Sequence, residues 1–369
     1  MPETCLTSLF FSLPLRVSAI IFGAIPDMTL RPLLILALVV AVLSTACGGS
    51  TKPQSSYLVY VSNEASGDLT VIDPDQPEAV ATIPLGKRPR GIHAFGNLLY
   101  VALSGSPFAP PGVDESTLPP ADKSADGIGV VDLRQNKLTH KIDAGSDPEE
   151  FALSQDGKTI YASNEDISGL SLVDLASGKL VATLPVGEEP EGVTLSPDSR
   201  FVYVTCENDG IVSVVDTAAG KVVKTIKVGR RPRSVEFLPD SSRAYVTNEN
   251  DGTVSVIDAA RQEPASTILL GEGVKPMGLA INKAGSRLYV STGRSKKVFV
   301  LDTASNAITA SFEVGQRPWG IELSPDDKLL FTANGPSNDV SVIDATSGAI
   351  IRKVKAGDRP WGVVVVPRN

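Results

Sequence analysis

One unit of sequence recurs seven times from Tyr57 to the end of the chain, and it limits the fold more than any other feature. Three markers appear in each copy in the same order. They are a Tyr-Val-Ser/Thr-Asn segment, an aspartate that ends a Val/Ile-rich stretch, and a Gly-x-x-Pro element. The usual period is 42 residues, as from Tyr161 to Tyr203 to Tyr245. Such a period indicates a set of similar supersecondary units packed side by side.

The copies of each marker can be followed along the chain. The first marker surrounds Tyr60, Tyr100, Tyr161, Tyr203, Tyr245, Tyr289 and Phe331. The aspartates are Asp73, Asp132, Asp174, Asp216, Asp258, Asp302 and Asp344. The third marker begins at Gly86, Gly145, Gly187, Gly229, Gly271 (with two extra residues), Gly315 and Gly357.

Each copy has the pattern of four short strands, here named A to D. One copy places them at Ser234–Leu238, Ala244–Thr247, Thr253–Ile257 and Ser266–Leu270. Strand C is apolar on both faces, as in Ile211–Val215, which is typical of a sheet packed between two others. Aromatic residues are only 5% of the chain, and Val and Ile, which favour strands, are frequent.

The two ends of the repeat region complement one another. The region begins at a strand B, Tyr57–Ser62, and ends with an isolated strand A, Trp361–Pro367. Pairing these two segments completes one sheet and removes the exposed edges of an open array. The sequence therefore predicts an all-β fold over residues 57–369, a seven-bladed β-propeller of four-stranded antiparallel blades closed by the C-terminal strand.

The repeated Tyr-Val-Ser/Thr-Asn segments resemble the YVTN-type β-propeller repeat family over all of Tyr57 to Asn369. That family is found in bacterial envelope and archaeal surface-layer proteins, and most of its members have no assigned activity. The resemblance implies the propeller fold and an extracytoplasmic location, and it specifies no reaction.

Residues 1–47 have the pattern of an export signal. Leu33–Leu43 is an apolar run of eleven residues, shorter than the roughly 20 of a membrane span, and Met28 is the predicted true start. The segment before Cys47 resembles a bacterial lipobox, although Ser44 stands where that motif has leucine. We expect lipidation of Cys47, a polar tether over 48–56 and an envelope location; cleavage after Ala46 would instead give a free secreted protein.

Charge and cysteine content limit the partners. The net charge of −8 and pI near 5.0 disfavour nucleic-acid binding, despite the basic segments Lys87–Arg90 and Arg230–Arg233. Cys5, Cys47 and Cys206 form no Cys-x-x-Cys motif, which disfavours zinc, thioredoxin-type and c-type haem sites. We therefore predict no cofactor or metal, with Ca²⁺ as the one candidate ion, and a monomer.

Features shared by every copy belong to the fold, so the irregular features indicate the functional face. The strand-end aspartates precede turns and are expected to accept backbone hydrogen bonds. The B–C and D–A loops share one end of the propeller and carry most of the irregularity, including a Pro-rich expansion between Leu103 and Gly127. Variable loops on a rigid scaffold favour this end as the binding face.

The residue after each D–A proline is expected to surround the mouth of the central channel. These residues are Arg90, Glu149, Glu191, Arg233, Met277, Trp319 and Trp361. The two tryptophans, the only ones in the chain, occupy neighbouring blades next to Arg90, an arrangement that suits an aromatic, sugar-like or peptide ligand. The alternative is that each tryptophan plugs the channel or packs under a loop.

A second set of glutamates follows strand B. They are Glu64, Glu165, Glu207 and Glu249. With Glu149 and Glu191 they make one side of the face acidic, and such carboxylates could hold Ca²⁺ or a basic partner. The simpler interpretation is a solvated rim.

Two functions from different classes remain. The first, which we favour from sequence, is an envelope-anchored binding module that contacts a protein, peptide or glycan through the B–C and D–A loop face. The alternative is a propeller enzyme such as a lactonase-type hydrolase, with Glu149, Glu191, Arg90 and Arg233 as its acid, base and electrophile candidates. A partner of a periplasmic redox pathway is a third option. His93, His140 and Cys206 are expected to be packed or solvated residues.

Overall fold

The computed structural model describes residues 54–108, 113 and 117–368. The predicted signal region, most of the tether, Cys5 and Cys47 lie outside the described residues. The chain divides into two units, Met1–Lys52 and Pro53–Asn369, and only the second is described here. No helix within these described ranges is long and apolar enough to span a membrane.

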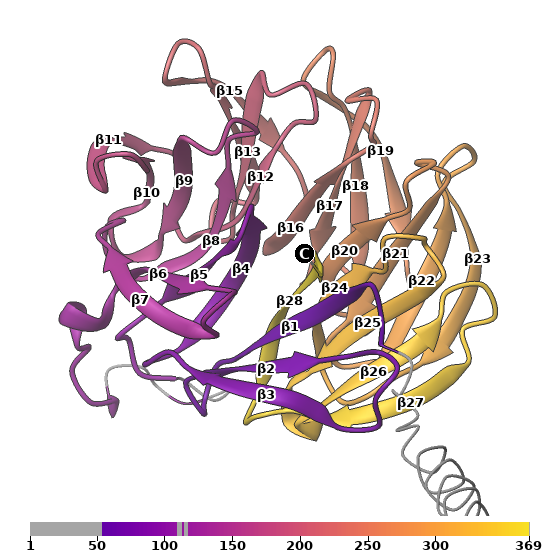
Figure 1. Cartoon of the computed structure of the whole chain (residues 1–369). Coiled ribbons are helices and arrows are strands. Elements are labelled where there is room, and N and C mark those ends of the chain that lie inside the picture. The colour runs from indigo at the N-terminus through magenta and orange to yellow at the C-terminus, as the bar shows by residue number, and fades with distance from the viewer. Residues whose placement is uncertain (1–53, 109–112, 114–116, 369) are drawn as a thin grey trace, which may run out of the picture. The chain divides into compact units, whose positions relative to one another are not determined.

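The described chain forms seven four-stranded antiparallel sheets, which we call blades 1 to 7 (Figure 1). Blade 1 contains β28 (Pro360–Pro367), β1 (Tyr57–Asn63), β2 (Asp68–Ile72) and β3 (Ala79–Pro84). Blade 2 contains β4 (Pro89–Phe95), β5 (Leu98–Leu103), β6 (Gly127–Asp132) and β7 (Lys137–Ile142). Blade 3 contains β8 (Pro148–Leu153), β9 (Thr159–Asn164), β10 (Gly169–Asp174) and β11 (Lys179–Pro185). Blade 4 contains β12 (Pro190–Leu195), β13 (Phe201–Cys206), β14 (Ile211–Asp216) and β15 (Lys221–Lys227).

The remaining three blades follow the same order. Blade 5 contains β16 (Pro232–Phe237), β17 (Arg243–Asn248), β18 (Thr253–Asp258) and β19 (Glu263–Leu269). Blade 6 contains β20 (Pro276–Ile281), β21 (Arg287–Thr292), β22 (Lys297–Asp302) and β23 (Ala307–Glu313). Blade 7 contains β24 (Pro318–Leu323), β25 (Leu329–Asn334), β26 (Asp339–Asp344) and β27 (Ile350–Lys355). Three short 3₁₀ helices lie in loops, η2 (Lys123–Ala125), η3 (Glu165–Ile167) and η4 (Gly335–Ser337).

The first strand of each blade lines a closed inner ring. Contacts run from β28 to β4, β8, β12, β16, β20, β24 and back to β28. The C-terminal strand pairs with the first ordered strand, with Val59 opposite Val365 and Val61 opposite Val363. Figure 1 shows β28 beside β1, near the centre of the ring. The predicted seven-bladed fold and its closure by the two chain ends are confirmed.

Strand C is buried on both faces because it lies between two neighbouring sheets. In β14, Val212, Ser213, Val214 and Val215 are all buried. Each interface between blades contains an apolar cluster; the one that seals the ring packs Val59 and Val61 of blade 1 against Phe331 and Val342 of blade 7. Burial of this apolar area, at about 25 cal/mol per Å², is the main force that holds the blades together.

The repeated Ser/Thr-Asn pair has a structural role. The hydroxyl of Thr205 donates to the carbonyl of Arg233 in the next blade (2.8 Å) and accepts from the N–H of Gly192 in its own blade (2.8 Å). Asn248 then donates to Ser255 of strand C (2.9 Å). The same hydroxyl bond between blades is made by Ser62, Ser163, Thr247 and Ser291. These five bonds hold in place the backbone of the residue after the D–A proline in blades 2, 4, 5, 6 and 7.

The inner strands approach one another so closely that glycine is required there. A Cβ atom on Gly320 would lie 2.4 Å from the carbonyl oxygen of Trp361, and one on Gly278 would lie 2.5 Å from that of Trp319. The glycine after each tryptophan or methionine of the ring is therefore a packing requirement.

The strand-end aspartates are structural, as expected. Asp216 accepts a hydrogen bond from the N–H of Ala219 (2.8 Å), and Asp302 accepts one from the N–H of Ser305 (2.8 Å). These turns lie at the end of the propeller opposite to the loops described next.

Candidate functional site at the channel mouth

The B–C and D–A loops interlock at one end of the channel. The N–H of Glu64 donates to the carbonyl of Arg359, and the N–H of Glu207 donates to that of Glu189, both at 2.9 Å. The residue before the D–A proline has positive φ in six of the seven blades: Arg88, Asp147, Glu189, Arg231, Arg317 and Arg359. Such backbone is costly for residues other than glycine and is often found at functional sites.

The two tryptophans lie together at the mouth. The rings of Trp319 and Trp361 stack with centroids 5.7 Å apart and planes at 25°. The guanidinium of Arg233 lies 5.1 Å from the centroid of Trp319, and that of Arg90 lies 6.0 Å from the centroid of Trp361. Both indoles are half-buried. They therefore form an aromatic platform bordered by cations, and they remain partly accessible.

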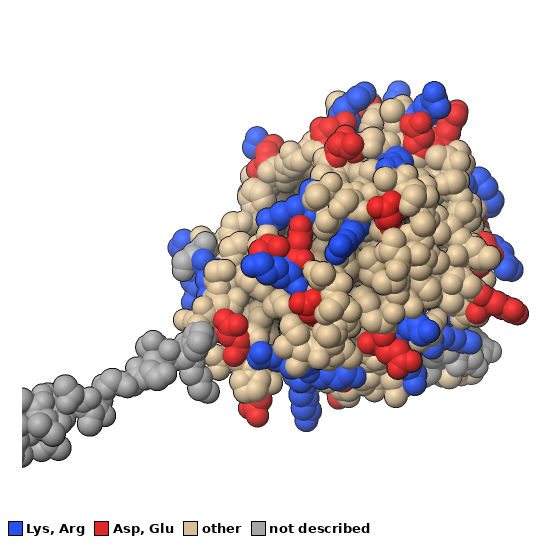
Figure 2. Space-filling model, turned by 90° about the vertical axis from the view of Figure 1, so that its right-hand side faces the viewer, with Lys and Arg blue, Asp and Glu red and all other residues tan. Residues whose placement is uncertain are grey.

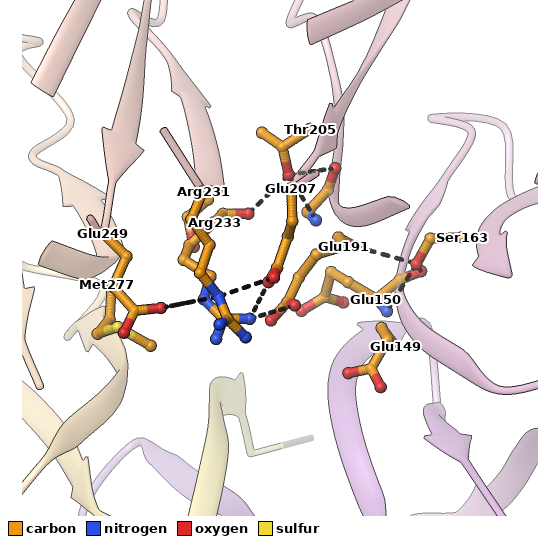
Figure 3. Close-up of polar contacts among 12 residues, drawn as sticks. Glu149, Glu150, Ser163, Glu191, Thr205, Glu207, Arg231, Arg233, Glu249 and Met277 are labelled. Carbon is orange, nitrogen blue, oxygen red and sulfur yellow. Dashed lines mark hydrogen bonds and ion pairs between the residues drawn. The ribbon is translucent and has the colours of Figure 1, made fainter. Parts of the chain in front are cut away.

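Arg233 is the centre of a buried ionic network (Figure 3). Its Nε lies 2.8 Å from Oε2 of Glu249, and its Nη1 contacts Glu191 and Glu207. Arg231 supplies a second cation, with Nε 2.8 Å from Oε2 of Glu207. Arg233 is only 7% exposed, so these pairs are screened little by solvent and hold the three carboxyl groups in fixed positions.

Glu191 and Glu207 both contact Arg233, and their pKa values are shifted in opposite directions. Burial, and then the adjacent charge of Glu191, raises the pKa of Glu207 well above its usual value. Burial also acts on Glu191, but Arg233 and a hydrogen bond from Glu207 outweigh it and lower the pKa of Glu191 to about 2. Two adjacent carboxyl groups with pKa values pushed apart have the arrangement of a general acid and a general base.

A second ionic network surrounds Arg90. Its Nε lies 2.9 Å from Oε1 of Glu64, and its Nη1 contacts Glu149. Glu64 also pairs with Arg88 at 3.3 Å and faces Arg359 at 3.8 Å. The interpretation as a solvated rim is therefore wrong for Glu64 and Glu207. Glu64 and Glu207 are 6% and 5% exposed, and arginines lie between the acids.

Blade 3 departs from this balance of charges. Asp147, Glu149 and Glu165 place one oxygen each within 4.8 Å of one another. Burial, and then the charges of Glu191, Asp147 and Glu189 against that of Arg90, raises the pKa of Glu165 to about 7. Two side chains of the Leu103–Gly127 expansion hold Asp147: the hydroxyl of Ser104 contacts its carboxylate, and the carboxylate of Asp126 accepts from its N–H at 3.0 Å.

One cation of the mouth is left without an acidic partner. The guanidinium of Arg317 lies 5.2 Å from the centroid of Trp319, and with the described residues it makes no ion pair or side-chain hydrogen bond. Burial, together with the charges of Arg233 and Arg359, lowers its pKa. Arg317 can therefore pair with an anionic group of a ligand on the tryptophan side of the mouth.

The expanded loop also borders the mouth. Phe108 lies 3.5 Å from the guanidinium carbon of Arg359, and the carbonyl of Ser106 accepts from Arg88 at 3.0 Å. Ser106 and Phe108 therefore border the mouth on the side of blades 1 and 2.

Below the mouth, the inner strands enclose a cavity of about 160 Å³. Trp319, Trp361, Arg233 and Glu191 line its upper part. Its wall also carries His93, Glu150, Glu236 and Glu322. His93 Nε2 lies 2.9 Å from Oε1 of Glu150, whose charge outweighs burial and raises the pKa of the histidine. Burial raises the pKa of both Glu236 and Glu322 to about 7.

The sequence placed one ring of residues at the mouth and missed two others. The missed mouth residues precede the D–A proline, and Arg317 and Asp147 belong to this set. The channel residues that the sequence did not indicate lie three positions after a residue of the ring along the chain. Glu236, for example, follows Arg233 by three residues. The strand register shifts between Pro232 and Val235, and this bulge breaks the alternation of side chains on which a period of two relies. The Gly-x-x-Pro marker could have indicated the residues before the D–A proline, because they occupy its third position in most copies.

Other predicted residues have structural positions. Cys206 is a free, fully buried cysteine, and burial raises the pKa of its thiol to about 12, which disfavours nucleophilic chemistry. Met277 is 2% exposed. Figure 2 shows Lys and Arg interspersed with Asp and Glu over the face that it displays, without a broad basic field.

Three comparisons relate the chain to known proteins. A family model described as "Lactonase, 7-bladed beta-propeller" matches residues 217–366. No curated protein matches the sequence. The fold is similar to that of Kuenenia stuttgartiensis hydrazine synthase, with a TM-score of 0.68 and 22% identity over 81% of this chain and 94% of that one.

Two further structures of similar fold are described as lactonases. A putative 6-phosphogluconolactonase from Bacteroides uniformis gives a TM-score of 0.68 and 16% identity, over 85% of this chain and 100% of that one. The periplasmic gluconolactonase of Pseudomonas aeruginosa gives a TM-score of 0.66 and 18% identity, over 84% of this chain and 99% of that one. At these identities the likeness concerns the fold alone. The family match over residues 217–366 favours the lactonase alternative over the binding module that we preferred from sequence.

Proposed function

We propose that the chain hydrolyses a lactone, the internal ester of a sugar acid or a related hydroxy acid, at the mouth of its central channel. The observation that carries the proposal is the Glu191–Glu207 carboxyl pair, which Arg233 fixes beside the tryptophan platform and above the cavity. The lactonase family match over residues 217–366 supports this reaction class.

The tryptophans and Arg317 fit the substrate. A sugar-like ring presents C–H groups that pack on the stacked indoles of Trp319 and Trp361. The carbonyl oxygen of the lactone gains negative charge during hydrolysis, and Arg317 is the cation without a protein partner that can stabilise it. The same guanidinium then binds the product carboxylate.

The carboxyl pair supplies the proton transfers. A water attacks the carbonyl carbon, forms the new C–O bond and gives its proton to the Glu191 carboxylate. The tetrahedral intermediate then breaks the ring C–O bond, and the leaving ring oxygen takes the proton of Glu207. The product is the open hydroxy acid. A proton passing from Glu191 to Glu207 restores the pair, which titrates as a unit.

The test is a pH-stat assay of glucono-δ-lactone and a series of other sugar lactones, corrected for spontaneous hydrolysis. We expect Glu191→Gln to lower kcat/KM by roughly 100-fold or more, because proton transfer by a positioned group contributes about that much. Trp319→Leu should raise KM more than it lowers kcat. The matched control is Glu188→Gln, which replaces an exposed carboxylate three residues earlier in the same loop and should retain the wild-type rate.

Two results would overturn the proposal. One is wild-type protein that changes its tryptophan fluorescence on adding lactones yet hydrolyses none of them, which would return the chain to the binding-module hypothesis. The other is a Glu191→Gln variant that folds normally and keeps the wild-type rate.

A further inference from the structure

Two blades lack a glutamate that the repeat supplies at the mouth in others. In blades 1, 3, 4 and 5 a glutamate follows strand B, whereas Gly293 and Gly335 stand there in blades 6 and 7. The backbone bond is the same in both cases. The N–H of Glu249 donates to the carbonyl of Arg231 at 2.9 Å, and the N–H of Gly335 donates to that of Arg317 at 3.3 Å. The two glycines therefore occupy the glutamate position without its carboxylate.

In two pairs of neighbouring blades this glutamate pairs with an arginine. The arginine is the residue before the D–A proline of the next blade. An oxygen of Glu64 in blade 1 lies 3.3 Å from Nη2 of Arg88 in blade 2, and one of Glu207 in blade 4 lies 2.8 Å from Nε of Arg231 in blade 5. The glutamate position of one blade is therefore within ion-pair distance of this arginine in the next.

The blades that follow Gly293 and Gly335 keep the arginine. Arg317 is the arginine after Gly293, and Arg359 is the one after Gly335. Within the described residues Arg317 forms no ion pair, and the one ion pair of Arg359 is long, with Nε 3.8 Å from Oε2 of Glu64. Glu64 already pairs with two other arginines. Both guanidiniums therefore lack the close carboxylate that the repeat provides elsewhere.

Neither glycine is required by the fold. A Cβ atom on Gly293 would have its nearest contact at 3.4 Å, and one on Gly335 at 3.7 Å, which are ordinary van der Waals distances. Neither residue has positive φ. Gly320 of the inner strand differs, because its Cβ would lie 2.4 Å from a carbonyl oxygen. What the two glycines change is the charge beside Arg317 and Arg359.

We propose that the mouth binds a dicarboxylate, with one carboxylate at Arg317 and the other at Arg359, in the places of the absent glutamates. A guanidinium binds a carboxylate through two parallel N–H bonds, and a carboxylate is the group that the repeat sets against the corresponding arginines of other blades. Each arginine lies two residues before one of the stacked tryptophans, so the carbon chain between the carboxylates packs on Trp319 and Trp361.

The charges at these two positions favour an anion. Burial, and then the charges of neighbouring arginines against those of Glu249 and Glu64, lowers the pKa of both Arg317 and Arg359. Arg359 is itself one of the arginines that lower the pKa of Arg317, so the two guanidiniums repel one another. Carboxylates bound at both positions offset this repulsion.

This inference rests on the proposed function, since it names the class of lactone that the site takes. That class is the lactone of a dicarboxylic sugar acid, which carries one free carboxylate beside the ring ester. Hydrolysis adds water to the ester and gives a dicarboxylate. The carboxylate that forms lies at Arg317, as in the proposed reaction, and the one already present lies at Arg359.

The test is isothermal titration of the full chain with gluconate and with glucarate. Glucarate differs from gluconate only in having a carboxylate in place of the terminal hydroxymethyl group. We expect glucarate to bind at least about tenfold more tightly, because a hydrogen bond between charged groups contributes roughly that factor. Arg359→Gln should remove this difference. Arg261→Gln, the same substitution at an exposed arginine in the turn between β18 and β19, is the control and should retain it.

Restoring the glutamate of the repeat gives a second test. Gly335→Glu places a carboxylate beside Arg359, as Glu64 is placed beside Arg88, and should exclude the second carboxylate of glucarate. Gly335→Ala adds no charge, and it should bind glucarate about tenfold more tightly than Gly335→Glu does. The melting temperature of each variant shows whether it is folded.

Equal affinities of the wild type for gluconate and glucarate would overturn the inference, even if the chain hydrolyses glucono-δ-lactone. So would 6-phosphogluconate that binds more tightly than glucarate, because the second position would then prefer a phosphate. The proposed function fails by a different result, the absence of lactone hydrolysis. A preference for glucarate that depends on Arg359 supports the dicarboxylate site in either case, since the titration measures binding alone.

Discussion

Two glutamates in the channel wall should make the stability of the fold depend on pH. Burial, and for Glu236 also the charge of Glu322, raises the pKa of each to about 7 in the folded protein. In the unfolded chain both return to the ordinary value of 4.5. Between these values the folded state binds more protons than the unfolded state. The contribution of these two groups to the free energy of unfolding should therefore be largest below pH 4.5 and be lost as the pH rises through 7.

The magnitude follows from the shift. A change of 2.5 units corresponds to about 3 kcal/mol for each group, at about 1.4 kcal/mol per unit. Glu322 is half-buried, so partial solvation reduces this to roughly 1–3 kcal/mol. Glutamine has the same shape and no charge. We therefore expect Glu322→Gln to stabilise the protein by that amount at pH 8 and to have little effect at pH 4.5.

The assay is denaturant unfolding of wild type and variant at pH 4.5 and pH 8, followed by circular dichroism. The difference in the free energy of unfolding between variant and wild type is compared at the two pH values, so the contributions of other titrating groups cancel. Glu236→Gln should behave in the same way. Glu313→Gln, which changes an exposed carboxylate at the end of β23, is the control and should show no such difference. The reasoning would be refuted by a Glu322→Gln effect that is equal at both pH values, or by destabilisation at pH 8.

Three other predictions concern the fold and the export signal. Truncation before Pro360 removes β28 and should abolish cooperative unfolding, since it opens the ring; a truncated chain that melts as wild type would contradict the closure. Gly320→Ala should destabilise by roughly 1–3 kcal/mol, because its Cβ would meet the Trp361 carbonyl at 2.4 Å, whereas Gly335→Ala, whose Cβ would have its nearest contact at an ordinary 3.7 Å, should cost less; equal melting temperatures would refute the packing argument. We propose that Cys47 is lipidated, so Cys47→Ser should abolish labelling by radioactive palmitate, and labelling that persists would exclude this cysteine.

The repeat made the fold predictable because each copy carries the same turn and strand markers. Tyr57–Ser62 and Trp361–Pro367 were predicted to pair because the first corresponds to strand B of the repeat and the second to strand A. The matching strands β1 and β28 do pair. The residues after the D–A prolines were also placed at the mouth, where Trp319 and Trp361 stack. These features follow from the position of a residue within one repeat.

Contacts between blades were less predictable, because they depend on which side chains face one another around the ring. The sequence showed Glu207 as one of a row of acids, whereas the fold brings Arg231 and Arg233 against it from the next blade. The bulge after each D–A proline also moved Glu322 into the channel wall, against the alternation expected of a strand. The YVTN-type assignment, the partner and the envelope location remain predictions.

The most direct test of the central claim is a crystal structure of the protein with gluconate, the hydroxy acid that glucono-δ-lactone yields. We predict that its carboxylate contacts Arg317, that its carbon chain packs on Trp319 and Trp361, and that Glu191 lies beside the carboxyl carbon. Gluconate bound at any other place, with the mouth left to solvent, would contradict the assignment of the active site.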